Sequence, residues 1–167
     1  MEVYTRILDE IEGFEYHVHR NDEEDFSFLG NDGYSIEVYN SEKKEEGSLF
    51  VEYDNRKYTI YFADNYEEFF PEYEEDVYFM LKEISALLHN KKCSVSLYYN
   101  TDGFLKCMSG GFMSSKELKD KDVKEVFRYI YMNKDLKDKL EINGGRADYK
   151  YFDDSLNRSV TIEKTKK

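Results

Sequence analysis

The stretch Tyr66–Asn90, YEEFFPEYEEDVYFMLKEISALLHN, contains the clearest helical pattern in the chain. Its apolar residues recur every three or four positions and so share one helix face; they are Val77, Met80, Leu81, Ile84, Leu87 and Leu88. Pro71 suits the first helical position, and Asn90 can end the helix in the left-handed conformation. The carboxylates at its start favour the positive end of the helix dipole; they are Glu67, Glu68, Glu72, Glu74, Glu75 and Asp76. This pattern predicts a central helix over Pro71–His89.

Alternating segments before that helix predict an antiparallel sheet, because the connections between them are too short for parallel crossovers. These segments are Phe14–Arg20, Tyr34–Tyr39, Ser48–Tyr53 and Lys57–Phe62. Met1–Glu12 has the spacing of an amphipathic helix that ends at Gly13. Asn21–Asp25 and Ser41–Gly47 are polar runs that indicate loops, and Phe26–Leu29 indicates a short strand.

The segments after the central helix continue the alternation of hairpins and helices. The predicted strands are Cys93–Tyr99, Phe104–Met108, Ala147–Phe152 and Arg158–Glu163. The first two form a hairpin across Asn100–Gly103, because Asp-Gly between β-rich runs is a strong turn signal. Ser114–Glu117 matches a capping box and opens a helical region that continues, with an interruption, to Asn143. The glycine-containing stretch Ser109–Ser114 predicts a looser segment and is the one place where a domain boundary could fall.

Hairpins separated by helices are typical of an α+β fold. We expect an antiparallel β-sheet of about six to eight strands, mostly hairpins, with the central helix and two or three further helices packed on it. The chain has 167 residues, enough to bury a core of its own, so we expect residues 1–167 to form a single α+β domain.

The sequence also bears on the compartment. No run of about 18 apolar residues occurs, and the first residues carry an early acid without a long apolar core, so we expect neither a membrane span nor a signal peptide. Cys93 and Cys107 lie on the two arms of one predicted hairpin, too far out of register for a disulfide. We expect both to be buried, reduced thiols, which indicates a cytoplasmic protein.

Charge is unevenly distributed along the chain. Residues 1–80 contain 23 acids and 6 bases, whereas residues 81–167 contain 13 acids and 18 bases. An acidic half of this size repels nucleic-acid phosphates, so we expect no direct contact with nucleic acid. It would attract a basic protein and accelerate the encounter, although acidic surfaces also serve solubility alone.

No arrangement of residues forms a convincing catalytic site. His17 and His19 share one strand face with Glu15, which is half of a metal site and suggests a metal-dependent hydrolase as an alternative function. No further His or Cys has the spacing to complete it. The acids of Asp22–Asp25 lack the alternating oxygens and central glycine of a calcium loop. We therefore expect no enzymatic activity, no cofactor and no metal.

The remaining functional pattern is carboxylates interleaved with aromatic residues. Aromatic side chains supply contact area at protein interfaces, and surrounding acids supply steering toward a basic partner. We expect a non-enzymatic, acidic protein-binding module, such as an inhibitor or immunity-type protein that neutralises a basic toxin or nuclease. The predicted contact residues are Asp22, Glu23, Glu24, Asp25, Asp64, Tyr66, Glu67, Glu68, Glu72, Tyr73 and Glu75. A nucleic-acid-mimicking inhibitor and a subunit of a larger assembly are further alternatives.

Overall fold

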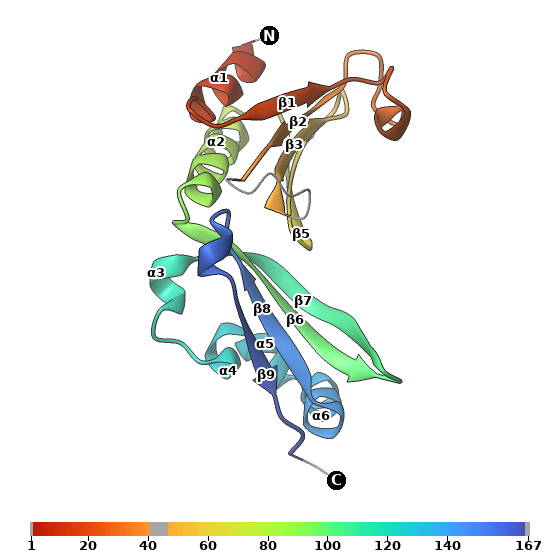
Figure 1. Ribbon diagram of the computed structural model, residues 1–167, viewed down its shortest axis with the longest axis vertical. Helices are drawn as coiled ribbons and strands as arrows, with labels where there is room; N and C mark the ends of the chain where they lie inside the picture. The colour runs from red at the N-terminus through yellow and green to blue at the C-terminus, as the bar shows by residue number, and fades with distance from the viewer. Residues whose placement is uncertain (1, 41–46, 166–167) are drawn as a thin grey trace.

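The computed structural model describes residues 2–40 and 47–165 and has an α+β fold built on two antiparallel sheets (Figure 1). The N-terminal sheet contains β1 (Tyr16–His19), β2 (Tyr34–Val38), β3 (Leu49–Tyr53), β4 (Tyr58–Phe62) and β5 (Asn65–Phe69). The C-terminal sheet contains β6 (Lys92–Thr101), β7 (Phe104–Ser114), β8 (Gly145–Lys150) and β9 (Arg158–Ile162). The predicted α+β class with antiparallel hairpins is confirmed, and the strands divide between two sheets where one was expected.

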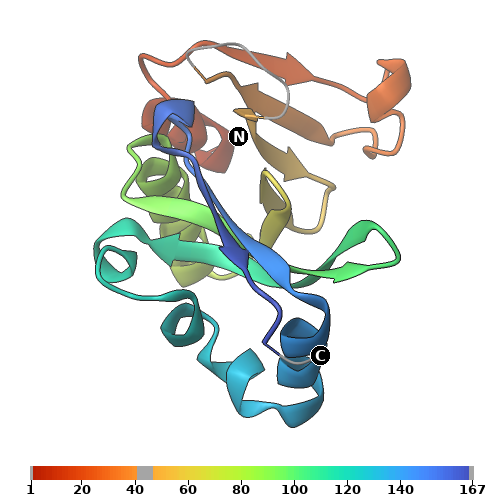
Figure 2. The ribbon, with the colours of Figure 1, turned by 60° about the horizontal axis from the view of Figure 1, so that its bottom comes forward.

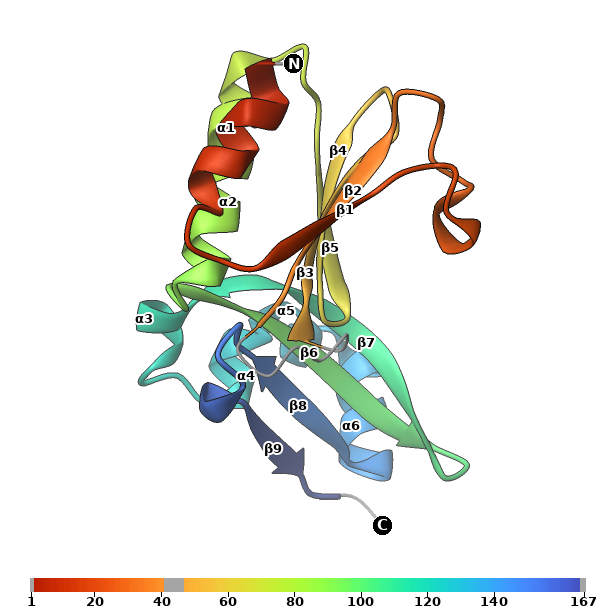
Figure 3. The same ribbon diagram turned by 45° about the horizontal axis from the view of Figure 1, so that its top comes forward.

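The N-terminal sheet is a meander in the order β1-β2-β3-β4-β5, so β1 and β5 are its edges. Helices α1 (Glu2–Glu10) and α2 (Glu74–Leu88) lie side by side on one face of this sheet (Figure 3). The apolar stripe of α2 packs with inward residues of the central strands; the core includes Ile36, Val38, Leu49, Val51, Ile60, Phe62, Met80, Ile84 and Leu87. The amphipathic pattern of α2 therefore acts as predicted, by burying one face against the sheet.

The opposite face of the N-terminal sheet carries polar and aromatic side chains. Strand residues alternate between the two faces, and the pairing register places one cross-strand row there: His17, Glu37, Phe50, Tyr61 and Tyr66. None of the residues in this row belongs to the core beneath α1 and α2. One face of the sheet is thus covered by α1 and α2, and the other face carries the titratable side chains of His17, Glu37, Tyr61 and Tyr66.

The C-terminal sheet has the order β7-β6-β8-β9 and a second core. Figure 2 shows it between the N-terminal sheet and the C-terminal helices, which are α3 (Ser115–Leu118), α4 (Val123–Val126), α5 (Arg128–Met132) and α6 (Lys134–Asn143). Inward residues of its strands pack against these helices; the core includes Cys93, Val95, Leu97, Phe127, Ile130, Leu140 and Tyr149. The side chain of Asn133 caps α6 by accepting hydrogen bonds from the amides of Asp135 and Leu136.

A buried amide joins the two sheets. The Asn65 side chain, at the start of β5, donates to Ser94 Oγ at 2.6 Å, to Ser96 Oγ at 2.9 Å and to the Val95 carbonyl at 3.3 Å. Ser94 and Ser96 lie on the face of β6 that points away from the C-terminal core, because the alternate residues Cys93, Val95 and Leu97 belong to that core. Gly110 on β7 leaves room for this amide, since a Cβ there would lie 2.1 Å from Asn65 Oδ1.

Helix α2 begins later than predicted, at Glu74. The preceding residues Asn65–Phe69 form strand β5, which pairs with β4 across a two-residue turn, and Pro71 follows the strand in a turn. Glu67 and Glu68 therefore lie on a strand, and the prediction that they stand at the helix start is wrong. Pairing with β4 explains why these residues form a strand, because hydrogen bonds to β4 satisfy their backbone N–H and C=O groups. The predicted end of the helix is confirmed, with Asn90 at φ 57°.

Three other local predictions are wrong. Phe26–Leu29 is not a strand, because 24–26 form a 3-10 helix, η1 (Glu24–Phe26), that continues into turns. Ser109–Ser114 is not a loosened boundary but the second half of β7, paired with β6 beyond a bulge at Leu97/Tyr98. Ser114 precedes the short helix α3 without a side-chain capping bond. The predicted Ser41–Gly47 connection lies outside the described residues except for Gly47.

The remaining predictions concern the two cysteines and a membrane-spanning helix. Cys93 and Cys107 are both free, and they lie on the paired strands β6 and β7. Cys93 is buried as expected, but Cys107 is exposed because it lies on the edge strand near the hairpin tip. Within residues 2–40 and 47–165, no helix is long and apolar enough to span a bilayer.

Candidate protein-binding groove

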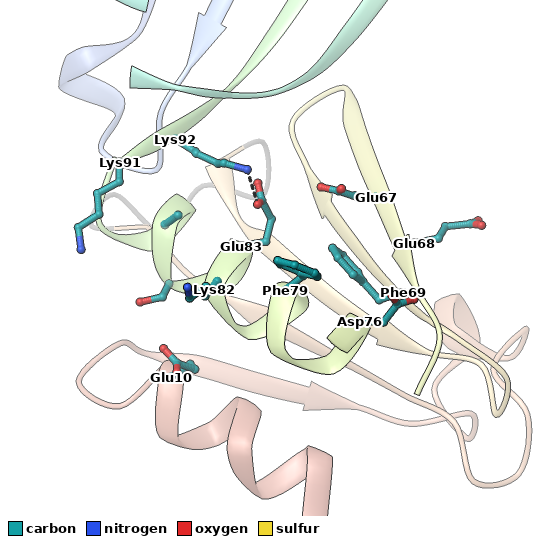
Figure 4. A pocket seen from close by; sticks show the side chains of 12 residues that line it. Glu10, Glu67, Glu68, Phe69, Asp76, Phe79, Lys82, Glu83, Lys91 and Lys92 are labelled. Carbon is teal, nitrogen blue, oxygen red and sulfur yellow. Dashed lines mark hydrogen bonds and ion pairs between the residues drawn. The ribbon is translucent and has the colours of Figure 1, made fainter. Parts of the chain in front are cut away.

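A groove of about 730 Å³ runs between α2 and the edge strand β5 (Figure 4). We call it the α2–β5 groove; it is lined by Glu10, Glu67, Glu68, Phe69, Asp76, Phe79, Lys82, Glu83, Ser85, Ala86, Lys91 and Lys92. Five of these side chains are carboxylates and three are lysines. The alternation of β5 turns Glu67 toward α2 and Glu68 away from it, as Figure 4 shows.

Negative charge is concentrated in the interior of the α2–β5 groove. Glu83 on α2 is only 7% exposed, and one of its oxygens accepts an ion-paired hydrogen bond from Lys92. Its other oxygen, Oε1, has no partner among the described residues. Burial raises the pKa of Glu67, the neighbouring charge of Glu83 raises it further, and Lys92 partly opposes both. A cation bound beside Glu67 would therefore relieve an unfavourable concentration of charge.

Exposed aromatic side chains adjoin the carboxylates. Phe79 lines the groove and is 56% exposed, because it lies off the buried apolar stripe of α2. Tyr78 next to it is 48% exposed, with its ring centroid 5.8 Å from that of Phe79. The ammonium group of Lys82 lies 4.3 Å from the centre of the Tyr78 ring. Exposed aromatic residues beside acidic groups are the combination expected of a surface that recognises cationic side chains.

The predicted contact residues between Asp64 and Glu75 lie around this groove but do not all face it. Glu67 and Glu68 line it, and Glu68 is ion-paired with Lys57. Asp64 lies in the β4–β5 turn, where it accepts a hydrogen bond from the Tyr98 phenol. Tyr66 belongs to the opposite sheet face, with its ring 5.9 Å from that of Tyr61. The remaining three are exposed between β5 and the first turn of α2; they are Glu72, Tyr73 and Glu75.

The predicted contact residues Asp22, Glu23, Glu24 and Asp25 lie elsewhere. Three of them line a second cavity of about 480 Å³, together with His19, Phe26, Glu37 and Phe50; the three are Glu23, Glu24 and Asp25. Glu37 and Phe50 point away from the face covered by α2. This cavity and Glu67, which faces α2, are therefore on opposite faces of the N-terminal sheet.

The histidines His17 and His19 lie beside this second cavity. Their ring centroids are 4.6 Å apart, and with Glu23 they form the group of potential metal ligands within the described ranges. Glu15, the carboxylate expected to join them, is not part of that group. His19 Nδ1 is 2.7 Å from Glu23 and Nε2 is 3.0 Å from Glu37. Burial alone would lower the pKa of His19, but the hydrogen bonds and charges of these two carboxylates raise it.

Several residues of these sites were missed by the sequence analysis. Phe79 and Tyr78 could have been found, because they are large apolar residues off the buried stripe of α2. The ion pair between Glu83 and Lys92 could not be predicted from the sequence, because it depends on where the start of β6 lies relative to α2. Glu37 looked like an ordinary outward residue of an alternating strand, and only the strand register places it against His19.

Comparisons with known proteins identify no relative. The sequence matches no protein-family model and none of the curated proteins, and the structure matches no solved structure.

Proposed function

We propose that this chain is a non-enzymatic, acidic protein-binding module that recognises a basic partner through the α2–β5 groove. A protein of the inhibitor or immunity type, which neutralises a basic toxin or nuclease, would act in this way. The observation that carries the proposal is the combination, within one groove, of the exposed ring of Phe79 with the crowded carboxylates Glu67 and Glu83.

Charge in the groove favours a lysine or arginine of a partner over an uncharged ligand. Because Glu67 has a raised pKa, its ionised form is held at an energetic cost in the free protein. A cationic side chain placed beside Glu67 and the unpartnered Oε1 of Glu83 would offset that cost on binding. The interaction would thus be stronger than that of a fully solvated surface pair.

Phe79 and Tyr78 would supply the apolar part of the interface. Binding would cover rings that are about half exposed in the free protein, and would also permit a cation to lie over a ring face. The overall charge of −12 would add long-range attraction and accelerate association with a basic partner. Two free cysteines are compatible with action in the cytoplasm, which we include in the proposal.

The test is affinity capture with three forms of the protein, followed by mass spectrometry of the bound proteins. The groove variant carries Glu67→Lys in the groove and Glu72→Lys and Glu75→Lys beside it, all at exposed positions. The matched control carries Asp120→Lys, Asp135→Lys and Glu163→Lys, which are exposed residues of the C-terminal half and produce the same change in net charge. A third form, Phe79→Ala, removes the aromatic contact without changing charge.

We expect a basic protein to be captured by the wild type and the control but lost with the groove variant. Surface plasmon resonance with that purified protein should then show association slowed at least about tenfold by the groove variant, with a weaker dependence on salt. Phe79→Ala should mainly accelerate dissociation. Equal association rates for the groove variant and its charge-matched control would refute the groove as the binding surface.

A further inference from the structure

His17, His19 and Glu23 bring three metal-ligand groups together beside the second cavity. The two histidines are separated by one residue on β1 and therefore point to the same face of the strand. The chain then turns between Arg20 and Glu23, where the Glu23 amide donates to the Arg20 carbonyl at 3.1 Å, and this turn places Glu23 beside them. One potential ligand atom from each of the three residues lies within 4.8 Å of the others.

Glu37 provides a second, independent observation at this place. It is 6% exposed, lines the cavity of about 480 Å³ and holds His19 Nε2 at 3.0 Å through its Oε2. Its other oxygen, Oε1, is buried without a hydrogen-bond partner in the part of the chain that the structure describes. Glu37 therefore places a buried carboxylate directly behind the imidazole of His19, on the side of the ring opposite to Glu23.

The surroundings also fix the ligands in place. The ring of His19 is stacked on Phe26, with centroids 4.0 Å apart and an interplanar angle of 10°. Glu37 faces Nε2, where it can accept a hydrogen bond from the ring N–H, and the Nδ1 atom of His19 faces Glu23. Glu23 accepts a hydrogen bond from the Arg20 amide on Oε1 and keeps Oε2 directed at the histidine. A carboxylate that orients a histidine from behind is the usual support of a metal-binding imidazole.

We propose that His17, His19 Nδ1 and Glu23 bind a divalent transition-metal ion, such as Zn²⁺, at the mouth of this cavity. Two imidazoles and one carboxylate are a recurrent ligand set for such ions, and the fourth position would be taken by water. Mg²⁺ and Ca²⁺ do not fit, because they require mainly oxygen ligands.

Binding requires only a small local movement. In the structure His19 Nδ1 and Glu23 Oε2 are 2.7 Å apart and share a hydrogen bond. Two ligands of a tetrahedral zinc ion lie about 3.3 Å apart, as follows from bond lengths near 2.0–2.1 Å. Glu23 can open this gap, because its side chain is 40% exposed and lies on a turn. The metal would then replace the proton between the two groups and fasten the η1 turn to β1.

The test is isothermal titration of the untagged protein, freed of metal by a chelator, with zinc chloride near neutral pH. We expect one Zn²⁺ per chain with micromolar or tighter affinity, an increase in melting temperature on binding, and no heat from magnesium chloride. His17→Ala should weaken binding at least tenfold and is expected to fold normally, because His17 is exposed. Glu23→Gln should have a similar effect, and Glu37→Gln should weaken binding by about 10–100-fold.

Two controls separate this site from casual binding of zinc to surface groups. Asp25→Asn changes an acid of the same cavity outside the ligand group, and His89→Ala removes the remaining histidine at the end of α2. Both variants should bind zinc as the wild type does. The proposal is overturned if the wild type shows no zinc binding in the submillimolar range, or if His17→Ala and Glu23→Gln bind as tightly as these controls. Unchanged affinity in Glu37→Gln would overturn the role given to Glu37.

Discussion

The contact between Asn65 and Gly110 tests how the two sheets are joined. Asn65→Ala removes the amide that bonds to the side chains of Ser94 and Ser96, two residues that are 1% and 2% exposed. Gly110→Ala places a methyl group where the Asn65 amide lies, since the three atoms nearest to its Cβ all belong to the Asn65 side chain. The two substitutions therefore act on one contact from opposite sides.

The geometry sets the size of each effect. Losing the buried hydrogen bonds to the two serine hydroxyls and to the Val95 carbonyl, with the hydroxyls left to rearrange, should lower the free energy of unfolding by about 2–4 kcal/mol in Asn65→Ala. For a chain of this length that corresponds to a fall in melting temperature of roughly 4–16 °C. Gly110→Ala alone should cost about 1–3 kcal/mol, because the amide must leave its position to avoid a contact of 2.1 Å.

The assay is a double-mutant cycle measured by urea unfolding, followed by far-ultraviolet circular dichroism. In the Asn65→Ala background the methyl group at position 110 has no amide to displace, so we expect most of its cost to disappear. The coupling energy should be about 1–2 kcal/mol. If Gly110→Ala costs the same in both backgrounds, the amide does not occupy the space next to Gly110, and the account of this junction is wrong.

Two further predictions concern titratable groups. Burial raises the pKa of Glu52, partly opposed by a hydrogen bond from Tyr61, so the folded state holds this proton more tightly than the unfolded state. Stability should therefore fall as pH rises through the folded pKa, and Glu52→Gln should be more stable than the wild type at neutral pH but not below about pH 4, as urea unfolding at both pH values will show. A thiol reagent should modify Cys107 alone in the native protein, and slowly, because burial and Asp64 raise its thiol pKa. Cys93 should react only after denaturation, and reaction of both thiols in the native state would contradict its burial.

Signals that depend on near neighbours in the chain were predicted well. The apolar stripe of α2, the hairpin over Asn100–Gly103 and the left-handed end at Asn90 all follow from patterns within a few residues. The last two strands, β8 and β9, were predicted from alternation and turn residues in the same way. In each case the conformation that the local sequence favours is also the conformation found in the structure.

Local sequence patterns gave wrong predictions where pairing with a neighbouring strand decided the conformation. Glu67 and Glu68 precede a proline and a helix, and only pairing with β4 makes them part of β5. Gly110 and Gly111 are typical of a loose connection, yet β6 holds them in a strand, and the space above Gly110 is occupied by Asn65. Patterns within a few residues do not include this gain, because the compensating hydrogen bonds come from the neighbouring strand of each hairpin.

The sequence by itself determined the α+β class, the amphipathic helix α2, the hairpins and the excess of acid in the first half. The tertiary structure decided that the strands form two sheets, that the second cavity and Glu67 are on opposite faces of the N-terminal sheet, and that Glu83 lies against Lys92 and Glu37 against His19. The reason is that helices and turns are selected by interactions between close neighbours. Sites, in contrast, are assembled from residues whose positions depend on the register of every strand between them.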